Sequence, residues 1–172
     1  MLVRVLNAQR QEAVSVARMA ALARRTARRL GIKASGVFEI SFIGAQRMRT
    51  LNRRFLGHDR PTDVLSFRYD GLTRGPGRTG RKGQDTVCGE VLIAPSQARI
   101  WARAHGAAYH DELSRYVVHG LLHWFGHEDH SPAQQRRMRL LEDRLLAGWR
   151  VGGFAGATHK QANRRTGQPA HR

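Results

Sequence analysis

The stretch "HGLLHWFGHEDH", residues 119–130, holds four histidines and two acidic residues. His119 and His123 are four residues apart, and residues at this spacing lie on one face of an α-helix, one turn apart. Both imidazoles can therefore bind one metal ion. A catalytic zinc site has three protein ligands and keeps one position for water. The stretch predicts a metal site on a helix that covers about residues 111–125.

The third ligand is expected beyond Gly126, where the chain can turn out of the helix and back toward the metal. His127 continues the four-residue spacing only if the helix runs on through Gly126. Asp129 and His130 lie beyond the turn, and a carboxylate and an imidazole are both ordinary zinc ligands. The residues alone leave the three open. We predict one zinc-type ion per chain, although histidine sites also accept nickel, copper or iron.

The residue after His119 argues against one class of metal enzyme. The zinc protease pattern HExxH places a glutamate directly after the first histidine, where it acts as the general base. The equivalent residue here is Gly120, which has no side chain. The sequence therefore argues against a protease of this type.

Hydrophobic periodicity predicts a mixed domain around the histidine helix. Short runs rich in β-branched and aromatic residues indicate strands, and apolar residues three or four apart indicate helices. The order of the elements predicts an α+β fold, with a mixed sheet of about four strands and about five helices. The expected strands are 3–6, 37–43, 63–69 and 87–95, and the expected helices are 12–30, 45–55, 96–106, 111–125 and 132–147.

Several local details follow from the same patterns. Polar and apolar residues alternate in 37–43, which predicts a strand with one polar face or an edge position. Ser96 is expected to cap the helix 96–106. Ser131, Pro132 and Gln134 predict a capping box at the start of the last helix. The expected buried stripes are Met48, Leu51 and Phe55 in 45–55, Val118, Leu122 and Phe125 in 111–125, and Met138, Leu141 and Leu145 in the last helix.

Length and composition set the organisation of the chain. Its 172 residues predict a single domain over 1–150. Residues 71–86 are rich in glycine and basic residues, which predicts a flexible basic loop, and residues 151–172 predict a disordered basic tail. Thirty Lys and Arg against 13 Asp and Glu give a formal net charge of +17. Such a charge attracts polyanions, most often nucleic acid.

The sequence also gives an expectation for the cellular compartment of the protein. Cys88 is the single cysteine, so an intramolecular disulfide is excluded and a reducing compartment fits best. The N-terminal apolar run is interrupted by Arg4 and Asn7, which argues against a secretory signal. No apolar stretch approaches the length that spans a bilayer. These features predict a cytoplasmic protein without a membrane partner.

Three motifs, in the same order, resemble those of the YbeY endoribonucleases, also called rRNA maturation factors. The histidine stretch is similar to that family's HGxLHLxGxDH. The segment "HDRPTDVLSFR", residues 58–68, is similar to KDxPTNVLSFP, and "GEVLIAPSQA", residues 89–98, is similar to the GDIVI segment. The resemblance covers about residues 37–147.

The resemblance implies a mixed four-stranded sheet, a zinc-type site and hydrolytic cleavage of single-stranded RNA. It implies a role in maturing the 3′ end of small-subunit (16S) rRNA and in ribosome quality control. The implied partners are ribosomal RNA, the small ribosomal subunit and an rRNA-binding GTPase. The alternative is a non-catalytic, metal-stabilised assembly factor that binds rRNA.

The family's third histidine usually follows the second by six residues, and this chain has Asp129 at that spacing and His130 one residue later. Turns tolerate an added residue, so the resemblance favours His119, His123 and His130 as ligands, with Asp129 as the alternative. Asp129 or Glu128 would then orient a ligating histidine.

A second departure concerns the groove of the active site. The family commonly has an arginine there that can stabilise negative charge on phosphate. The equivalent position in this chain is Leu56. Arg54 and Arg60 flank it and are the candidate catalytic residues.

Overall fold

The computed structural model describes residues 2–32, 36–69 and 87–149. The predicted basic loop 71–86 and the predicted tail 151–172 lie outside these ranges. The prediction of an α+β fold, with a mixed sheet of four strands and five helices, is confirmed. The elements are β1 (Leu2–Asn7), α1 (Val16–Arg29), β2 (Val37–Phe42), α2 (Ala45–Leu56), β3 (Val64–Arg68), β4 (Val87–Ile93), α3 (Pro95–His105), α4 (Tyr109–Trp124) and α5 (Pro132–Leu146).

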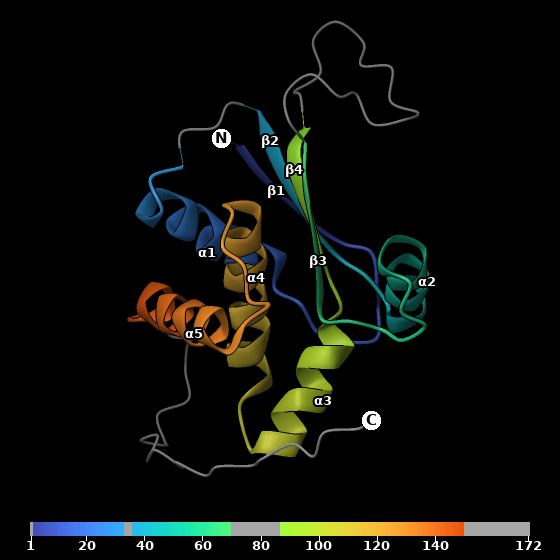
Figure 1. Ribbon diagram of the computed structural model, residues 1–172. Helices are drawn as coiled ribbons and strands as arrows, with labels where there is room; N and C mark the ends of the chain where they lie inside the picture. The colour runs from blue at the N-terminus through green and yellow to red at the C-terminus, as the bar shows by residue number, and fades with distance from the viewer. Residues whose placement is uncertain (1, 33–35, 70–86, 150–172) are drawn as a thin grey trace, which may run out of the picture.

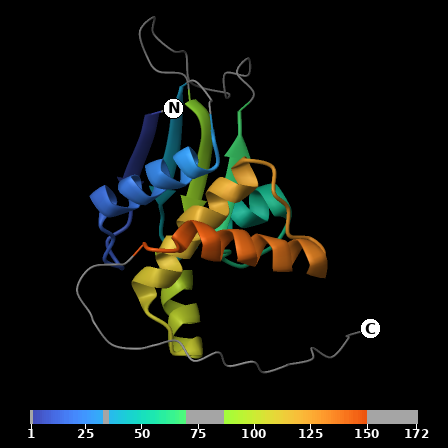
Figure 2. The same ribbon diagram turned by 90° about the vertical axis from the view of Figure 1, so that its left-hand side faces the viewer.

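The strand order in the sheet is β1-β2-β4-β3. The first three strands in this order are parallel, and β3 runs antiparallel to β4. Helices α1, α4 and α5 lie on one side of the sheet and α2 on the other (Figure 1). The view turned by 90° shows α1, α4 and α5 together in front of the strands (Figure 2). None of the helices in the described ranges is long and apolar enough to cross a membrane.

Strand β2 corrects one prediction, because it is not an edge strand and its polar residue is not on an exposed face. It pairs with β1 on one side and β4 on the other. Glu39 is 6% exposed and accepts a 2.8 Å hydrogen bond from the Arg4 guanidinium. Arg4 lies directly opposite Glu39 in the β1–β2 register. A paired carboxylate can therefore occupy the inside of the sheet at a tolerable cost of desolvation.

Some details at the helix ends also differ from the prediction. Phe55 and Phe125 are 54% and 44% exposed, because each lies where its helix is ending and leaves the core. Helix α3 begins at Pro95 rather than after a Ser96 cap, since proline is well suited to the first helical position. The capping box of α5 at Ser131 is confirmed.

Helix α4 lies directly on the sheet, and Gly120 makes the close approach possible. A Cβ atom at Gly120 would lie 2.5 Å from Cγ1 of Val91 on β4. The Ser66 hydroxyl on β3 donates a 3.2 Å hydrogen bond to the Gly120 carbonyl. The glutamate of an HExxH protease therefore has no room at this position. On either side, Val118 and Leu122 are fully buried, as predicted.

We predict that Gly120→Ala destabilises the fold. Overpacking a tight contact typically costs about 1–3 kcal/mol, because Val91 or the helix must move. Chemical denaturation should show a lower midpoint with an unchanged slope. An unchanged midpoint would show that α4 can shift away from β4 at no cost.

Candidate metal centre

His119 and His123 occupy the last two turns of α4, and the chain then reverses toward α5. Gly126 adopts a positive φ of 95°, a conformation that glycine accepts without strain. The helix ends before it, as the sequence predicted. The reversed chain brings Asp129 back to the two histidines. One Asp129 oxygen lies 3.8 Å from Nε2 of His119, and the other lies 3.6 Å from Nε2 of His123.

These three side chains match the requirements of a metal ion. The Nε2 atoms of His119 and His123 are 3.0 Å apart. A tetrahedral zinc ion with bonds of about 2.0–2.1 Å separates its ligand atoms by roughly 3.3–3.4 Å. The distance between the two Nε2 atoms is slightly shorter than this value, and the distances of 3.8 and 3.6 Å to the two different Asp129 oxygens are slightly longer. Among the described residues, one group of three potential ligands has all its ligand atoms within 4.8 Å of one another, and it consists of His119, His123 and Asp129.

The structure does not bring His130 into this group. The His130 side chain is 82% exposed, and its Nε2 lies 3.1 Å from a carboxylate oxygen of Glu128. Asp129 keeps the six-residue spacing from His123 at which the family resemblance places its third ligand. At this spacing no residue is added before the third position, and that position holds a carboxylate in place of a histidine. The His127 ring lies near Phe125, with 6.0 Å between ring centroids, and outside the group.

Glu142 on α5 supports the site from behind. Its carboxylate oxygen Oε1 lies 2.8 Å from Nδ1 of His119, and Oε2 accepts a 2.8 Å hydrogen bond from Arg115. When Nδ1 carries the hydrogen, Nε2 presents its lone pair to His123 and Asp129. Carboxylates commonly hold metal-binding histidines in this way.

The sequence analysis missed Glu142 and expected Asp129 or Glu128 in this role. A pattern that pointed to Glu142 was present. The residue lies four after Met138 and three before Leu145, which are both buried. A carboxylate on a buried stripe needs a partner of opposite charge or a hydrogen-bond donor.

Burial and neighbouring charges shift the protonation of this cluster in different directions. Burial alone would lower the pKa of His119, but the hydrogen bond and charge of Glu142, with the charges of Asp63 and Asp129, raise it overall. Burial and the adjacent His119 lower the pKa of His123. Burial opposes ionisation of Glu142, yet His119 and Arg115 lower its pKa overall. Glu142 is therefore a carboxylate at neutral pH, as its role behind His119 requires.

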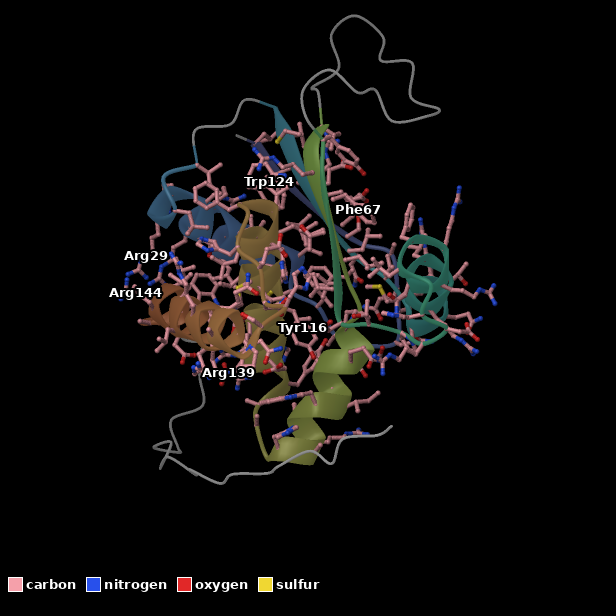
Figure 3. The ribbon with its side chains drawn as sticks, in the orientation of Figure 1. Arg29, Phe67, Tyr116, Trp124, Arg139 and Arg144 are labelled. Carbon is pink, nitrogen blue, oxygen red and sulfur yellow. The ribbon has the colours of Figure 1, made fainter. Side chains whose placement is uncertain are left out.

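A groove of about 570 Å³ is lined by residues of α2, α3 and α4 and of the segment before β3. Tyr116 lies one turn before His119 on α4 and forms part of the groove wall. Figure 3 shows Tyr116 between the α4 and α3 ribbons. Asp63 also lines the groove, and its charge reaches His119. The groove therefore includes the turn of α4 that precedes His119.

Of the two candidate arginines, Arg60 lines the groove and Arg54 does not. Arg60 lines the groove, together with Leu56. Asn52 donates a 2.7 Å hydrogen bond to the Arg60 carbonyl and fixes the backbone there. Arg54 is exposed on α2 with its guanidinium 5.7 Å from the centre of the Phe55 ring, and it does not line the groove.

A model of the family described as endoribonuclease YbeY matches residues 4–150 of this chain. The chain belongs to the YbeY family. A YbeY endoribonuclease from Salinispora tropica is 34% identical over 133 residues, which cover 76% of this chain and 85% of the relative. One from Thermobifida fusca is 35% identical over 133 residues, which cover 77% and 84%.

The fold has a counterpart among solved structures. The solution structure of TM1509 from Thermotoga maritima matches with a TM-score of 0.53 and 22% identity, over 86% of this chain and 91% of that one. At this identity the similarity supports the fold alone.

We predict that Glu142→Gln lowers zinc affinity by about 10- to 100-fold, the usual cost of losing an outer-shell partner. Glutamine keeps the size of the side chain but removes the charge that holds His119. Competition with a chromogenic chelator measures the affinity. Asp143→Asn is the matched control, because Asp143 also pairs with Arg115 but does not contact His119. Equal zinc affinity in both variants would contradict the role of Glu142.

Proposed function

We propose that this chain is a metal-dependent endoribonuclease that cleaves single-stranded RNA and matures the 3′ end of small-subunit (16S) rRNA. The observation that carries the proposal is the cluster of His119, His123 and Asp129 at the end of α4, a helix that also contributes Tyr116 to the groove. Two further facts support it: the net charge of +17 suits an RNA substrate, and the curated relatives are described as endoribonucleases.

The metal ligands that we propose are His119, His123 and Asp129, in place of the set with His130. When bound, a zinc-type ion supplies a Lewis acid that activates water at neutral pH and polarises a phosphoryl oxygen. Glu142 holds the His119 ring with Nε2 toward the ion. Two imidazoles and one carboxylate would supply three protein ligands, the number that catalytic zinc sites use when water is the remaining ligand.

Arg60 is the residue that we assign to the substrate phosphate. It lines the groove, and a guanidinium can donate two parallel hydrogen bonds to phosphate oxygens. Its charge offsets the negative charge that develops on the phosphate during cleavage. Arg54 contributes to the positive field of the α2 surface, which attracts RNA over longer distances.

The wider role that we propose follows the YbeY resemblance. It includes ribosome quality control, action in the cytoplasm, and contact with the small ribosomal subunit and an rRNA-binding GTPase. The single domain over 1–150 would carry the metal centre and the groove. The basic segments 71–86 and 151–172 would add phosphate contacts without sequence preference.

Leu56 favours a second candidate function. Its side chain lines the groove and is 56% exposed, at the position where the resemblance places an arginine. A groove with fewer phosphate contacts suits a protein that binds rRNA during ribosome assembly without cutting it. In this case the metal would stabilise α4 and α5.

Incubation with a precursor of small-subunit rRNA separates the two functions. The enzyme is expected to cut near the 3′ end, to stop when a chelator is added, and to recover when zinc is restored. Tight binding without cleavage, with or without zinc, would reject the enzyme and support the assembly factor. Cleavage that resists chelation would reject the metal-dependent mechanism.

A further inference from the structure

Helix α3 carries a pair of stacked rings on the groove. The ring centroids of Trp101 and His105 are 4.1 Å apart, and their planes differ by 16°. Nδ1 of His105 lies 2.9 Å from the Trp101 carbonyl oxygen, which fixes the ring one turn along the helix. The indole is partly buried and the imidazole exposed. The pair is therefore a rigid, flat surface that needs little reordering before it binds a ligand.

The neighbours of this pair make one wall of the groove apolar. Both rings line the groove, as do Ile100 and Leu56. Ile100 and Leu56 are 60% and 56% exposed, and grouped apolar surface in a groove is typical of a binding site. Arg60 lines the same groove. The groove thus offers an apolar, aromatic wall and a cation, as a nucleotide with its flat base and charged phosphate requires.

The position of the groove links these rings to the metal centre. Tyr116 contributes to the groove and precedes His119 by one turn of α4. Asp63, in the segment before β3, lines it as well. A strand of RNA in the groove would therefore contact both the rings on α3 and the turn of α4 that precedes His119.

We propose that Trp101 and His105 form a stacking platform for an unpaired nucleobase close to the cleaved linkage. The inference deepens the proposed function, on which it rests. Every base has a flat π-face, so stacking tolerates sequence variation. Paired bases in a duplex keep their faces covered. The platform thus explains how the groove selects single-stranded RNA, and it makes Trp101 a specificity-determining residue.

Binding of a short single-stranded oligoribonucleotide to the full-length chain tests the platform. Chelator is present throughout, so that cleavage does not interfere, and fluorescence anisotropy gives the Kd. Trp101→Leu keeps an apolar side chain without a ring, and we expect the Kd to rise by roughly 5- to 150-fold, the usual effect of losing one stacked base. Trp101→Phe keeps a ring and should retain most of the affinity.

Two controls separate stacking from charge and from folding. Arg103→Ala removes an exposed charge on the same helix, outside the groove lining, and should change the Kd less than Trp101→Leu. Thermal melting checks that each variant is folded. An oligonucleotide with abasic sites should bind the wild type weakly and lose little more with Trp101→Leu.

Equal Kd values for Trp101→Leu and Trp101→Phe, or full binding of the abasic oligonucleotide, would overturn the platform. A duplex that competes as well as the single strand would overturn it too. These results are independent of catalysis. Cleavage of the rRNA precursor by the wild type, with RNA affinity unaffected by Trp101→Leu, would retain the enzyme and reject the platform. Absence of cleavage, with Trp101-dependent binding intact, would reject the enzyme alone.

Discussion

Replacing His123 with alanine is expected to abolish metal-dependent cleavage of the small-subunit rRNA precursor. Loss of one preorganised electrostatic group commonly costs about 10²–10³-fold in kcat, and loss of the metal removes the largest local charge of the site. The fold should survive, because the His123 side chain is partly exposed and does not belong to the hydrophobic core clusters. Single-turnover cleavage at saturating protein measures the chemical step.

His130→Ala is the matched control for this experiment. It makes the same substitution in the same stretch, at a side chain that is 82% exposed and outside the cluster. We expect it to cleave at the wild-type rate. If His123→Ala also cleaved at the wild-type rate, with zinc present, the metal would have no part in the reaction.

Asp129→Ala is expected to lower zinc affinity by more than about 100-fold. The loss of an outer-shell carboxylate already costs about 10- to 100-fold, and Asp129 is proposed as a direct ligand. Two imidazoles alone remain, because the His130 ring is directed to Glu128. Isothermal titration gives the affinity, and elemental analysis of the purified protein gives the zinc content per chain.

The same measurements on His130→Ala decide between the two assignments. With Asp129 as the ligand, His130→Ala keeps one zinc per chain. Loss of zinc from His130→Ala, together with its retention in Asp129→Ala, would reverse the assignment and support the ligand set favoured by the resemblance. Asp129→His tests the spacing directly, since it restores a histidine six residues after His123.

Hydrophobic periodicity predicted the helices and strands well, because an element that buries one face has apolar residues at regular spacing along the sequence. The strand 63–69 and the helix 111–125 differ from β3 and α4 by only one or two residues at either end. Periodicity does not predict the order of the strands in the sheet. Glu39 therefore suggested a polar face or an edge, although Arg4 on the neighbouring strand neutralises it inside the sheet.

The sequence predicted one part of the candidate site and not the other. The helix repeat predicted that His119 and His123 point to one ion. The turn after Gly126 has no repeat, so spacing alone did not choose between Asp129 and His130. The role of Glu142 was not predicted for a related reason. Its contact with His119 depends on how α5 packs across α4, which the spacing of residues in the sequence does not give.

The segment from α4 to α5 contains the proposed ligands and Glu142 without interruption, whereas the groove joins residues from α2, the segment before β3, α3 and α4. Local contacts form faster, because closing a short loop loses less chain entropy. The metal centre is therefore expected to form early in folding and the groove later. A nascent chain could take up its ion before it can hold RNA, and the ion would then guide α5 onto α4.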